Sequence, residues 1–208
     1  MSEETSGFKS VTLLLEAGNL PADLLHAVDE LVARLGLRVY LSTAQNLRLI
    51  GIPAAELDDV KALLGARGAI FKGPGKFPVP KVCIGKQDCN LGLVDTAALS
   101  RLIMERFGDR MNVKPKFKIA IAGCPASCSN ALLTDIGMVA TRNGYDIYVG
   151  GKGGPTPLVG RRIVRRADDM EVLRVIGQLV DFHDVKTGKK QRMAKLLDEP
   201  DFPYPEAV

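Results

Sequence analysis

The sequence has no tryptophan, only two histidines, and no apolar run that approaches the ~18 residues of a membrane-spanning helix. Residues 1–6 lack the basic and then apolar stretch of a secretory signal, so we expect a cytoplasmic protein with no membrane part. No Gly-x-Gly-x-x-Gly fingerprint follows a predicted strand, which argues against NADPH or flavin binding by this chain. His26 and His183 both fall in predicted helices far in sequence from the cysteines, so cysteine–histidine catalysis has no support.

Runs of like charge are also missing. The 208 residues carry a net charge of +4, and the lysines and arginines are scattered along the chain. This mild excess argues against nucleic acid as a partner and favours a small anion. The chain contains 4 cysteines, which in a reducing cytoplasm are more often metal ligands or plain thiols than disulfides.

Residues 1–72 are predicted to form the first half of an α+β fold, a ferredoxin-like β-α-β-β-α unit. Apolar and alternating segments predict strands over 10–16, 39–43 and 47–52. Apolar residues at helical spacing predict helices over 19–36 and 54–64, the first of them closed by Gly36.

Residues 73–186 are predicted to form a second, α/β half, which begins at the loop rich in glycine and proline over 73–80. We expect a helix capped by Asp95 or Thr96, a strand over 116–122, a hairpin around Asn143 and Gly144, and a final helix over 168–184. A glycine-rich loop at 150–155 and a basic strand at 161–166 lie between the hairpin and that helix. Residues 187–208 are predicted to be an irregular tail.

The cysteines form two pairs, Cys83-x5-Cys89 and Cys124-x3-Cys128, on two predicted loops. Two loops can present four thiolates from several directions, as an iron–sulfur cluster requires. Paired zinc ligands are usually two to four residues apart, so the x5 spacing argues against zinc. Free cysteines are also common as simple buried residues. The spacing alone leaves all three interpretations open.

The predicted strand that leads to Cys124 has an unusual face. Because side chains alternate along a strand, Lys114, Lys116 and Lys118 would share one face with Ala120 and Ala122. Such lysines repel one another, so this face would suit an anion held above a metal cofactor, and the alanines would leave room for something flat. The alternative is an edge strand that carries lysines to prevent unwanted pairing.

Taken together, these motifs resemble the siroheme-dependent sulfite and nitrite reductases over about residues 10–185. The matching segments are Cys83-Ile-Gly-Lys-Gln-Asp-Cys89, Lys116-Phe-Lys-Ile-Ala-Ile-Ala-Gly-Cys124-Pro-Ala-Ser-Cys128, Asp135-Ile-Gly-Met-Val, Val149-Gly-Gly-Lys and, more weakly, Ser42-Thr-Ala-Gln-Asn-Leu-Arg-Leu-Ile-Gly-Ile52. The combination of C-x5-C with Gly-Cys-Pro-x-x-Cys is the specific part of the match.

The resemblance implies a six-electron reduction of sulfite to sulfide, or of nitrite to ammonia, with electrons from an external low-potential donor such as a ferredoxin. It implies that Cys83, Cys89, Cys124 and Cys128 hold a 4Fe–4S cluster and that Cys128 also bridges to the iron of siroheme. Lys116 and Lys118 match the cationic pocket that binds the anion and assists proton delivery. Candidates for the siroheme carboxylates are Gln45, Asn46, Arg48, Asn130, Gly151, Lys152 and Arg161, with Arg162 and the backbone of 150–154 beside them.

One position departs from the family pattern. Ala44 stands where catalytic modules carry an arginine, and the chain has one module where the family usually has two. Lys81, Lys86 or another cation could replace the arginine, or a second copy in a homodimer or a partner subunit could complete the pocket. The remaining alternative is a non-catalytic protein that uses its cluster for electron transfer or redox sensing.

Overall fold

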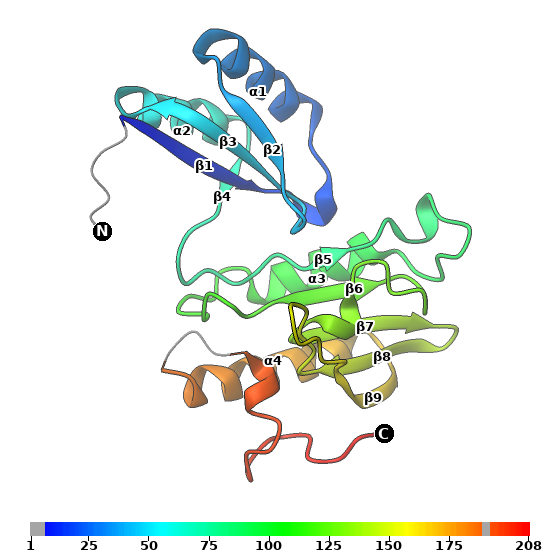
Figure 1. Cartoon of the computed structure of the whole chain (residues 1–208). Helices are drawn as coiled ribbons and strands as arrows, with labels where there is room; N and C mark the ends of the chain where they lie inside the picture. The colour runs from blue at the N-terminus through cyan, green and yellow to red at the C-terminus, as the bar shows by residue number, and fades with distance from the viewer. Residues whose placement is uncertain (1–6, 189–191) are drawn as a thin grey trace. The chain divides into compact units, whose positions relative to one another are not determined.

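The computed structural model describes residues 7–188 and 192–208, and the chain divides into two compact units, Met1–Gly73 and Pro74–Val208 (Figure 1). Each unit has its own sheet, of four strands in the first and five in the second. No helix of the described residues is long and apolar enough to cross a membrane.

The first unit confirms the predicted ferredoxin-like half. Its elements are β1 (Phe8–Leu14), η1 (Glu16–Gly18), α1 (Ala22–Leu35), β2 (Arg38–Leu41), β3 (Asn46–Pro53), η2 (Ala54–Glu56), α2 (Leu57–Ala66) and β4 (Ile70–Phe71). The strands pair antiparallel in the order β2-β3-β1-β4. Gly36 ends α1 in the left-handed conformation, which glycine adopts without steric cost. A single apolar core joins the inner face of β1 and β3 to both helices.

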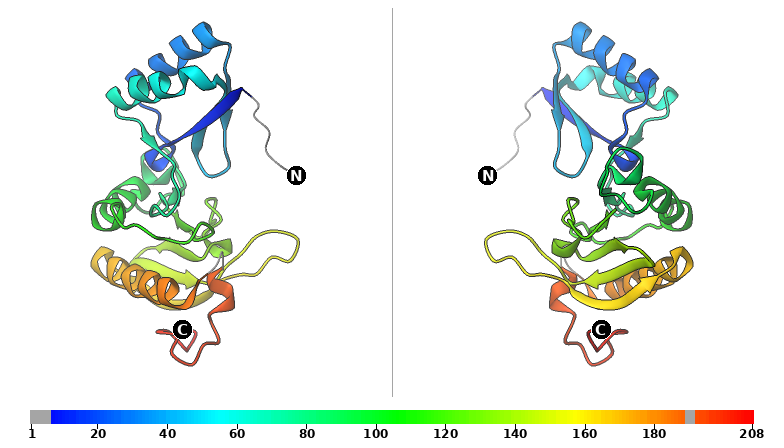
Figure 2. Two further views of the ribbon diagram at one scale, coloured as in Figure 1. Left: turned by 90° about the vertical axis from the view of Figure 1, so that its left-hand side faces the viewer. Right: turned by 90° about the vertical axis from the view of Figure 1, so that its right-hand side faces the viewer.

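The second unit holds both cysteine pairs. Its elements are β5 (Lys81–Val82), η3 (Gly85–Gln87), α3 (Thr96–Phe107), β6 (Ile119–Ala122), η4 (Ala131–Leu133), β7 (Ile136–Thr141), β8 (Gly144–Val149), β9 (Arg161–Ala167), α4 (Asp169–Lys186) and η5 (Met193–Lys195). The strand order is β5-β6-β7-β8-β9, with β5, β6 and β7 parallel and the last two antiparallel. Helices α3 and α4 lie on the same side of this sheet (Figure 2).

The predicted strand over 116–122 is wrong at its start, because β6 begins only at Ile119. Pro115 has no N–H for a ladder, and the Phe117 N–H donates to the Lys114 carbonyl (3.0 Å), which closes a turn. Lys114 and Lys116 therefore lie outside the strand, and the regular lysine face does not exist. Ala120 and Ala122 are completely buried in a cluster with Ala131 and Val139, so the chain itself fills the space predicted for a flat group.

The tail predicted over 187–208 is irregular apart from η5, but its described part is well packed. Met193, Leu196 and Phe202 are buried, and the Arg161 guanidinium donates to the Tyr204 carbonyl (2.8 Å) and lies 5.3 Å from the Phe202 ring centroid. Residues 189–191 of this predicted tail lie outside the described residues. The C-terminal segment 192–208 is thus part of the second unit.

Asp95 gives a test of how α3 begins next to the first cysteine loop. Its carboxylate accepts from the Ala98 N–H (3.0 Å), and this hydrogen bond lowers the pKa of Asp95. Replacing an N-cap aspartate costs about 1 kcal/mol, so Asp95→Ala should lower the free energy of unfolding by about that much at pH 7. Because the folded-state pKa is lowered, the difference should disappear as the pH falls below the ordinary aspartate range.

Chemical denaturation at pH 7 and near pH 2 measures this difference. Asp109→Ala, an exposed carboxylate at the other end of α3, is the matched control and should change stability by less than about 0.5 kcal/mol. Equal losses for the two variants at pH 7 would contradict a capping role for Asp95.

Candidate functional site

The two cysteine loops begin side by side because they follow neighbouring parallel strands. Val82 pairs with Ile121, so Cys83 and Gly123 both come just after the carboxyl ends of β5 and β6. The Gly123 N–H donates to Cys83 Sγ (3.0 Å), and the Leu93 N–H donates to the Gly123 carbonyl (2.8 Å). A backbone amide aimed at a cysteine sulfur is a typical feature of iron–sulfur ligation.

Glycines allow close backbone packing in the cysteine loops. Gly92 packs against residues 85–86 of the same loop, and Gly123 of the second loop packs against Cys83 of the first. A Cβ on Gly92 would lie 2.5 Å from the carbonyl carbon of Gly85, and a Cβ on Gly123 would lie 3.3 Å from Cys83 Sγ. Gly92 therefore has no room for a side chain, and a side chain at Gly123 would be tightly packed against its neighbours. Backbone N–H groups can therefore come near the cysteine sulfurs, as the predicted loops require.

The second loop turns back on itself between Cys124 and Asn130. The Ser127 N–H donates to the Cys124 carbonyl (3.1 Å) and the Asn130 N–H to the Ser127 carbonyl (2.8 Å). Ser127 and Asn130 both have positive φ, 52° and 58°, as the tight turn demands. Cys128 is exposed on this turn, whereas the other three cysteines are half-buried.

Two buried hydroxyl groups flank Cys128, those of Ser127 and Ser129, and neither has a hydrogen-bond partner among the described residues. A buried hydroxyl left unpaired costs about 1–3 kcal/mol, so a bound group that accepts hydrogen bonds would suit this turn. The sulfides and thiolates of an iron–sulfur cluster are such acceptors. Among residues 7–188 and 192–208, no three His, Cys, Asp or Glu side chains meet as a metal-ligand group. The chain offers four thiols on two adjoining loops as donors for a cluster, although no three of them meet in the part of the chain that the structure describes.

Lys118 and Lys81 act on each other at the start of this sheet. Lys81 lies on β5 opposite Ala120, two residues beyond Lys118. Burial, and next the positive charge of Lys118, lower the pKa of Lys81. Lys118 and Lys116 are both exposed, Lys116 in the turn before the strand. The structure therefore provides a cationic pair, Lys81 and Lys118, in place of the predicted row of lysines.

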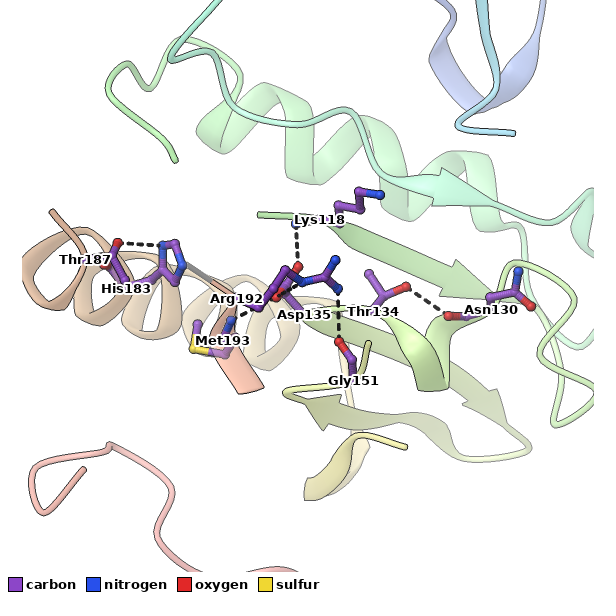
Figure 3. A network of polar contacts seen from close by, with 9 residues as sticks. All are labelled: Lys118, Asn130, Thr134, Asp135, Gly151, His183, Thr187, Arg192 and Met193. Carbon is purple, nitrogen blue, oxygen red and sulfur yellow. Dashed lines mark hydrogen bonds and ion pairs between the residues drawn. The ribbon is translucent and has the colours of Figure 1, made fainter. Parts of the chain in front are cut away.

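A buried carboxylate, that of Asp135, organises the backbone around Lys118 (Figure 3). Asp135 is fully buried, and its oxygens accept from the Lys118 N–H (3.1 Å), the Met193 N–H (2.9 Å) and Arg192 Nε (2.9 Å). Burial raises the pKa of Asp135, against the lowering effect of Arg192 and the Met193 N–H. In the sequence, Asp135 appeared only as part of the segment Asp135-Ile-Gly-Met-Val. No sequence motif pointed to Arg192.

The glycine-rich loop after β8 is held by the same residues. The Gly150 N–H donates to the Asp135 carbonyl (2.9 Å), and the Gly151 carbonyl accepts from the Arg192 guanidinium (3.1 Å). A Cβ on Gly151 would lie 2.4 Å from the Leu132 carbonyl oxygen, so this position requires glycine. Lys152 pairs with Leu158 through two backbone hydrogen bonds of 2.9 and 2.8 Å, which leaves the exposed tip 153–157 between them.

The other predicted cofactor residues lie in turns or form hydrogen bonds and ion pairs within their own unit. In the first unit, Gln45 has a φ of 60°, the Asn46 N–H donates to the Ser42 hydroxyl (3.1 Å), and Arg48 donates to the Ser10 hydroxyl (2.7 Å). In the second, Arg161 binds carbonyls of the C-terminal segment and Arg162 pairs with Asp146 (3.0 Å). Cofactor binding by Gln45, Asn46, Arg48, Asn130, Lys152 and Arg161 stays a prediction.

Comparison with protein-family models gives two matches along the chain. Residues 2–67 match the nitrite/sulfite reductase ferredoxin-like half domain, and residues 78–202 match the nitrite and sulphite reductase 4Fe-4S domain. The second match covers all four cysteines, Lys118, Asp135 and Arg192.

Individual relatives are also nitrite and sulfite reductases, at low sequence identity. The chain is 26% identical over 200 residues to the nitrite reductase (NAD(P)H) of Emericella nidulans, covering 94% of this chain and 18% of the relative. It is 29% identical over 119 residues to an assimilatory-type sulfite reductase of Nitratidesulfovibrio vulgaris, covering 57% of this chain and 54% of the relative. The solved structure of the Mycobacterium tuberculosis NirA protein superposes with a TM-score of 0.74 at 26% identity, over 91% of this chain and 38% of that one.

Gly92 gives a test of the close packing in the cysteine loop. Gly92→Ala should lower the free energy of unfolding by about 1–3 kcal/mol, because the added Cβ forces the backbone of 85–86 to move. The bound iron and labile sulfide per chain should fall with it. Gly65→Ala in α2 is the matched control, since a Cβ there meets nothing within 4 Å. Normal iron content in the Gly92 variant would show that the loop tolerates a different conformation.

Proposed function

The chain belongs to the nitrite and sulphite reductase family, and from this premise we propose that it reduces sulfite by six electrons at a siroheme coupled to a 4Fe–4S cluster. The observation that carries the proposal is the pair of cysteine loops that begin together after β5 and β6, with the Gly123 N–H directed at Cys83 Sγ. The chain spans 18% of the Emericella nitrite reductase, so the activity of that whole protein is not transferred to it.

The proposed cluster ligands differ in solvent exposure: three thiols are half-buried and one is exposed. Cys83, Cys89 and Cys124 are half-buried, which suits ligands that serve the cluster alone. Cys128 is exposed, so its sulfur is the one free to reach a second metal centre. This difference in exposure supports Cys128 as the bridge between the cluster and the haem iron.

Siroheme, when bound, would supply the redox chemistry for reduction of the anion. On this proposal, Lys118 and Lys116 bind the anion through their ammonium groups and donate hydrogen bonds to its oxygens, which helps these oxygens leave as water. Lys81, whose pKa is lowered by burial and by the nearby charge of Lys118, adds a further cation. The siroheme carboxylates are assigned, on motif alone, to Gln45, Asn46, Arg48, Asn130, Gly151, Lys152 and Arg161.

Sulfite is the first proposed substrate and nitrite the second. The 119 residues aligned with the assimilatory-type sulfite reductase make up 54% of that protein, so its length is close to that of this chain. The nitrite reductase of Emericella matches more of this chain but is several times longer. That relative is named for NAD(P)H, and this chain has no dinucleotide fingerprint, so we propose a separate low-potential donor such as a ferredoxin. The cytoplasm is the expected compartment, because four thiolate ligands require reducing conditions.

One measurement tests the cofactors, namely the visible spectrum of anaerobically purified protein with its iron, zinc and labile sulfide counted. We expect siroheme bands together with a cluster, followed by oxidation of a reduced viologen dye when sulfite is added. A cluster without siroheme would instead support the alternative of an electron-transfer or redox-sensing protein. Zinc without labile sulfide would exclude both proposals.

The lysines give a second test, on the loaded enzyme. Lys118→Ala should reduce kcat/KM for sulfite on the order of a hundredfold, because it removes a charge that stabilises the departing oxygens. Lys116→Ala should act in the same direction, and both variants should keep their cluster. Lys61→Ala, an exposed lysine of α2, is the control and should leave the rate unchanged. Full activity in both Lys116 and Lys118 variants would remove these lysines from the site.

A further inference from the structure

Asp135 connects three segments that are far apart in the sequence. Its side chain accepts from the Lys118 N–H just before β6 and from the Met193 N–H at the start of η5. Its own carbonyl accepts from the Gly150 N–H at the start of the glycine-rich loop. One fully buried residue therefore fixes the backbone at Lys118, at Met193 and at Gly150.

Arg192 uses two different donors within the same network (Figure 3). Its Nε donates to Asp135 Oδ1 (2.9 Å), and a terminal nitrogen donates to the Gly151 carbonyl (3.1 Å). The side chain is 23% exposed, so the ion pair is partly sheltered from water. The planar guanidinium fork can hold both acceptors at once, which an ammonium group cannot do in the same geometry.

We propose that Asp135 and Arg192 form a clamp by which the C-terminal segment 192–208 positions Lys118 and the glycine-rich loop for anion and cofactor binding. Asp135 and Arg192 are positioning residues, because each acts through the backbone of another residue. The consequence for substrate binding rests on the proposed function, whereas the clamp itself rests on the contacts of Asp135 and Arg192.

The other contacts of the C-terminal segment separate positioning from simple attachment. Lys186 of α4 pairs with Asp201 (2.6 Å) and Glu199 (3.2 Å), and Arg161 of β9 binds the Leu197 and Tyr204 carbonyls. These contacts also hold the segment on the second unit, but none of them includes Lys118, Gly150 or Gly151. Loss of the clamp should therefore loosen the site even while the segment stays attached.

The experiment compares Arg192→Gln, Arg192→Lys and Asp135→Asn with Lys186→Gln as the matched control. Arg192→Gln removes the charge and the fork, whereas Arg192→Lys keeps the charge near Asp135 and loses the second donor to Gly151. Asp135→Asn removes the charge and keeps one acceptor oxygen, for only one of the two backbone amides that donate to Oδ1 and Oδ2. Lys186→Gln breaks the other ion pairs of the segment and leaves the clamp intact.

The first readout is backbone amide hydrogen exchange in the protein as purified, which needs no turnover. Arg192→Gln should speed exchange about tenfold at Lys118 and across 150–152, since a charge-assisted hydrogen bond is lost at each side. Arg192→Lys should restore protection at Lys118 and leave 150–152 fast. Lys186→Gln should leave both regions as in the wild type.

The second readout is the affinity of siroheme-loaded protein for nitrite and sulfite, from the shift in its absorbance. Arg192→Gln and Asp135→Asn should weaken anion binding by about tenfold or more, because a small displacement of Lys118 is enough to lose its contact. Their unfolding midpoints should be compared with that of Lys186→Gln, so that a general loss of stability is recognised.

Unchanged exchange at Lys118 and 150–152 in Arg192→Gln would overturn the clamp, as would equal changes in Lys186→Gln. If exchange changes as expected but the wild type reduces neither sulfite nor nitrite, the proposed function fails and the clamp stands. If exchange changes but the anion affinity of the loaded protein is within twofold of wild type, the clamp is structural and its positioning role is wrong.

Discussion

The parallel pairing of β5 with β6 is the constraint on which the site depends. Parallel strands place their carboxyl ends at one edge of a sheet and need a crossover connection between them, which α3 provides here. Because each strand is followed at once by a cysteine loop, the crossover brings sequence-distant thiols to the same edge. The ladder itself is only two residues long, Lys81–Val82 against Ala120–Ile121. The loops therefore also rely on their own contacts, such as the Leu93 N–H to the Gly123 carbonyl (2.8 Å).

The partly buried ion pair between Asp135 and Arg192 holds backbone segments in place more than it adds stability. The free energy lost when two charges are removed from water is about as large as the free energy gained from their attraction, so such pairs add little net stability. Asp135 also satisfies the backbone amides of Lys118 and Met193, which would otherwise be unpaired inside the protein. Its removal would leave those amides and the Arg192 guanidinium without their acceptor. The carboxylate is thus retained where several backbone segments must keep fixed positions.

Local features of the fold could be predicted from the sequence, and features set by distant contacts could not. The cap at Asp95 and the turn at Asn143 and Gly144 depend on neighbouring residues, and the structure has both. The predicted start of β6 was wrong because lysines and apolar residues alternate from Lys114 onwards, as they would in a strand. Phe117 is buried, but it belongs to the irregular segment before β6. Arg192 was missed since its partner lies 57 residues earlier in the chain. The carboxyl-edge placement of the cysteines follows from topology, which spacing alone does not encode.

The cations of the second unit bear on the alanine at position 44. Lys81 lies on β5 and Lys118 just before β6. Burial, and next the charge of Lys118, lower the pKa of Lys81, so the two ammonium groups repel each other. A small anion near both ammonium groups would relieve this repulsion, which favours anion binding beside Lys81 and the amino end of β6. On the proposed function, this pair gives the second unit positive charge of its own for a sulfite or nitrite ion. The attraction of this lysine pair for an anion does not depend on a charge at position 44.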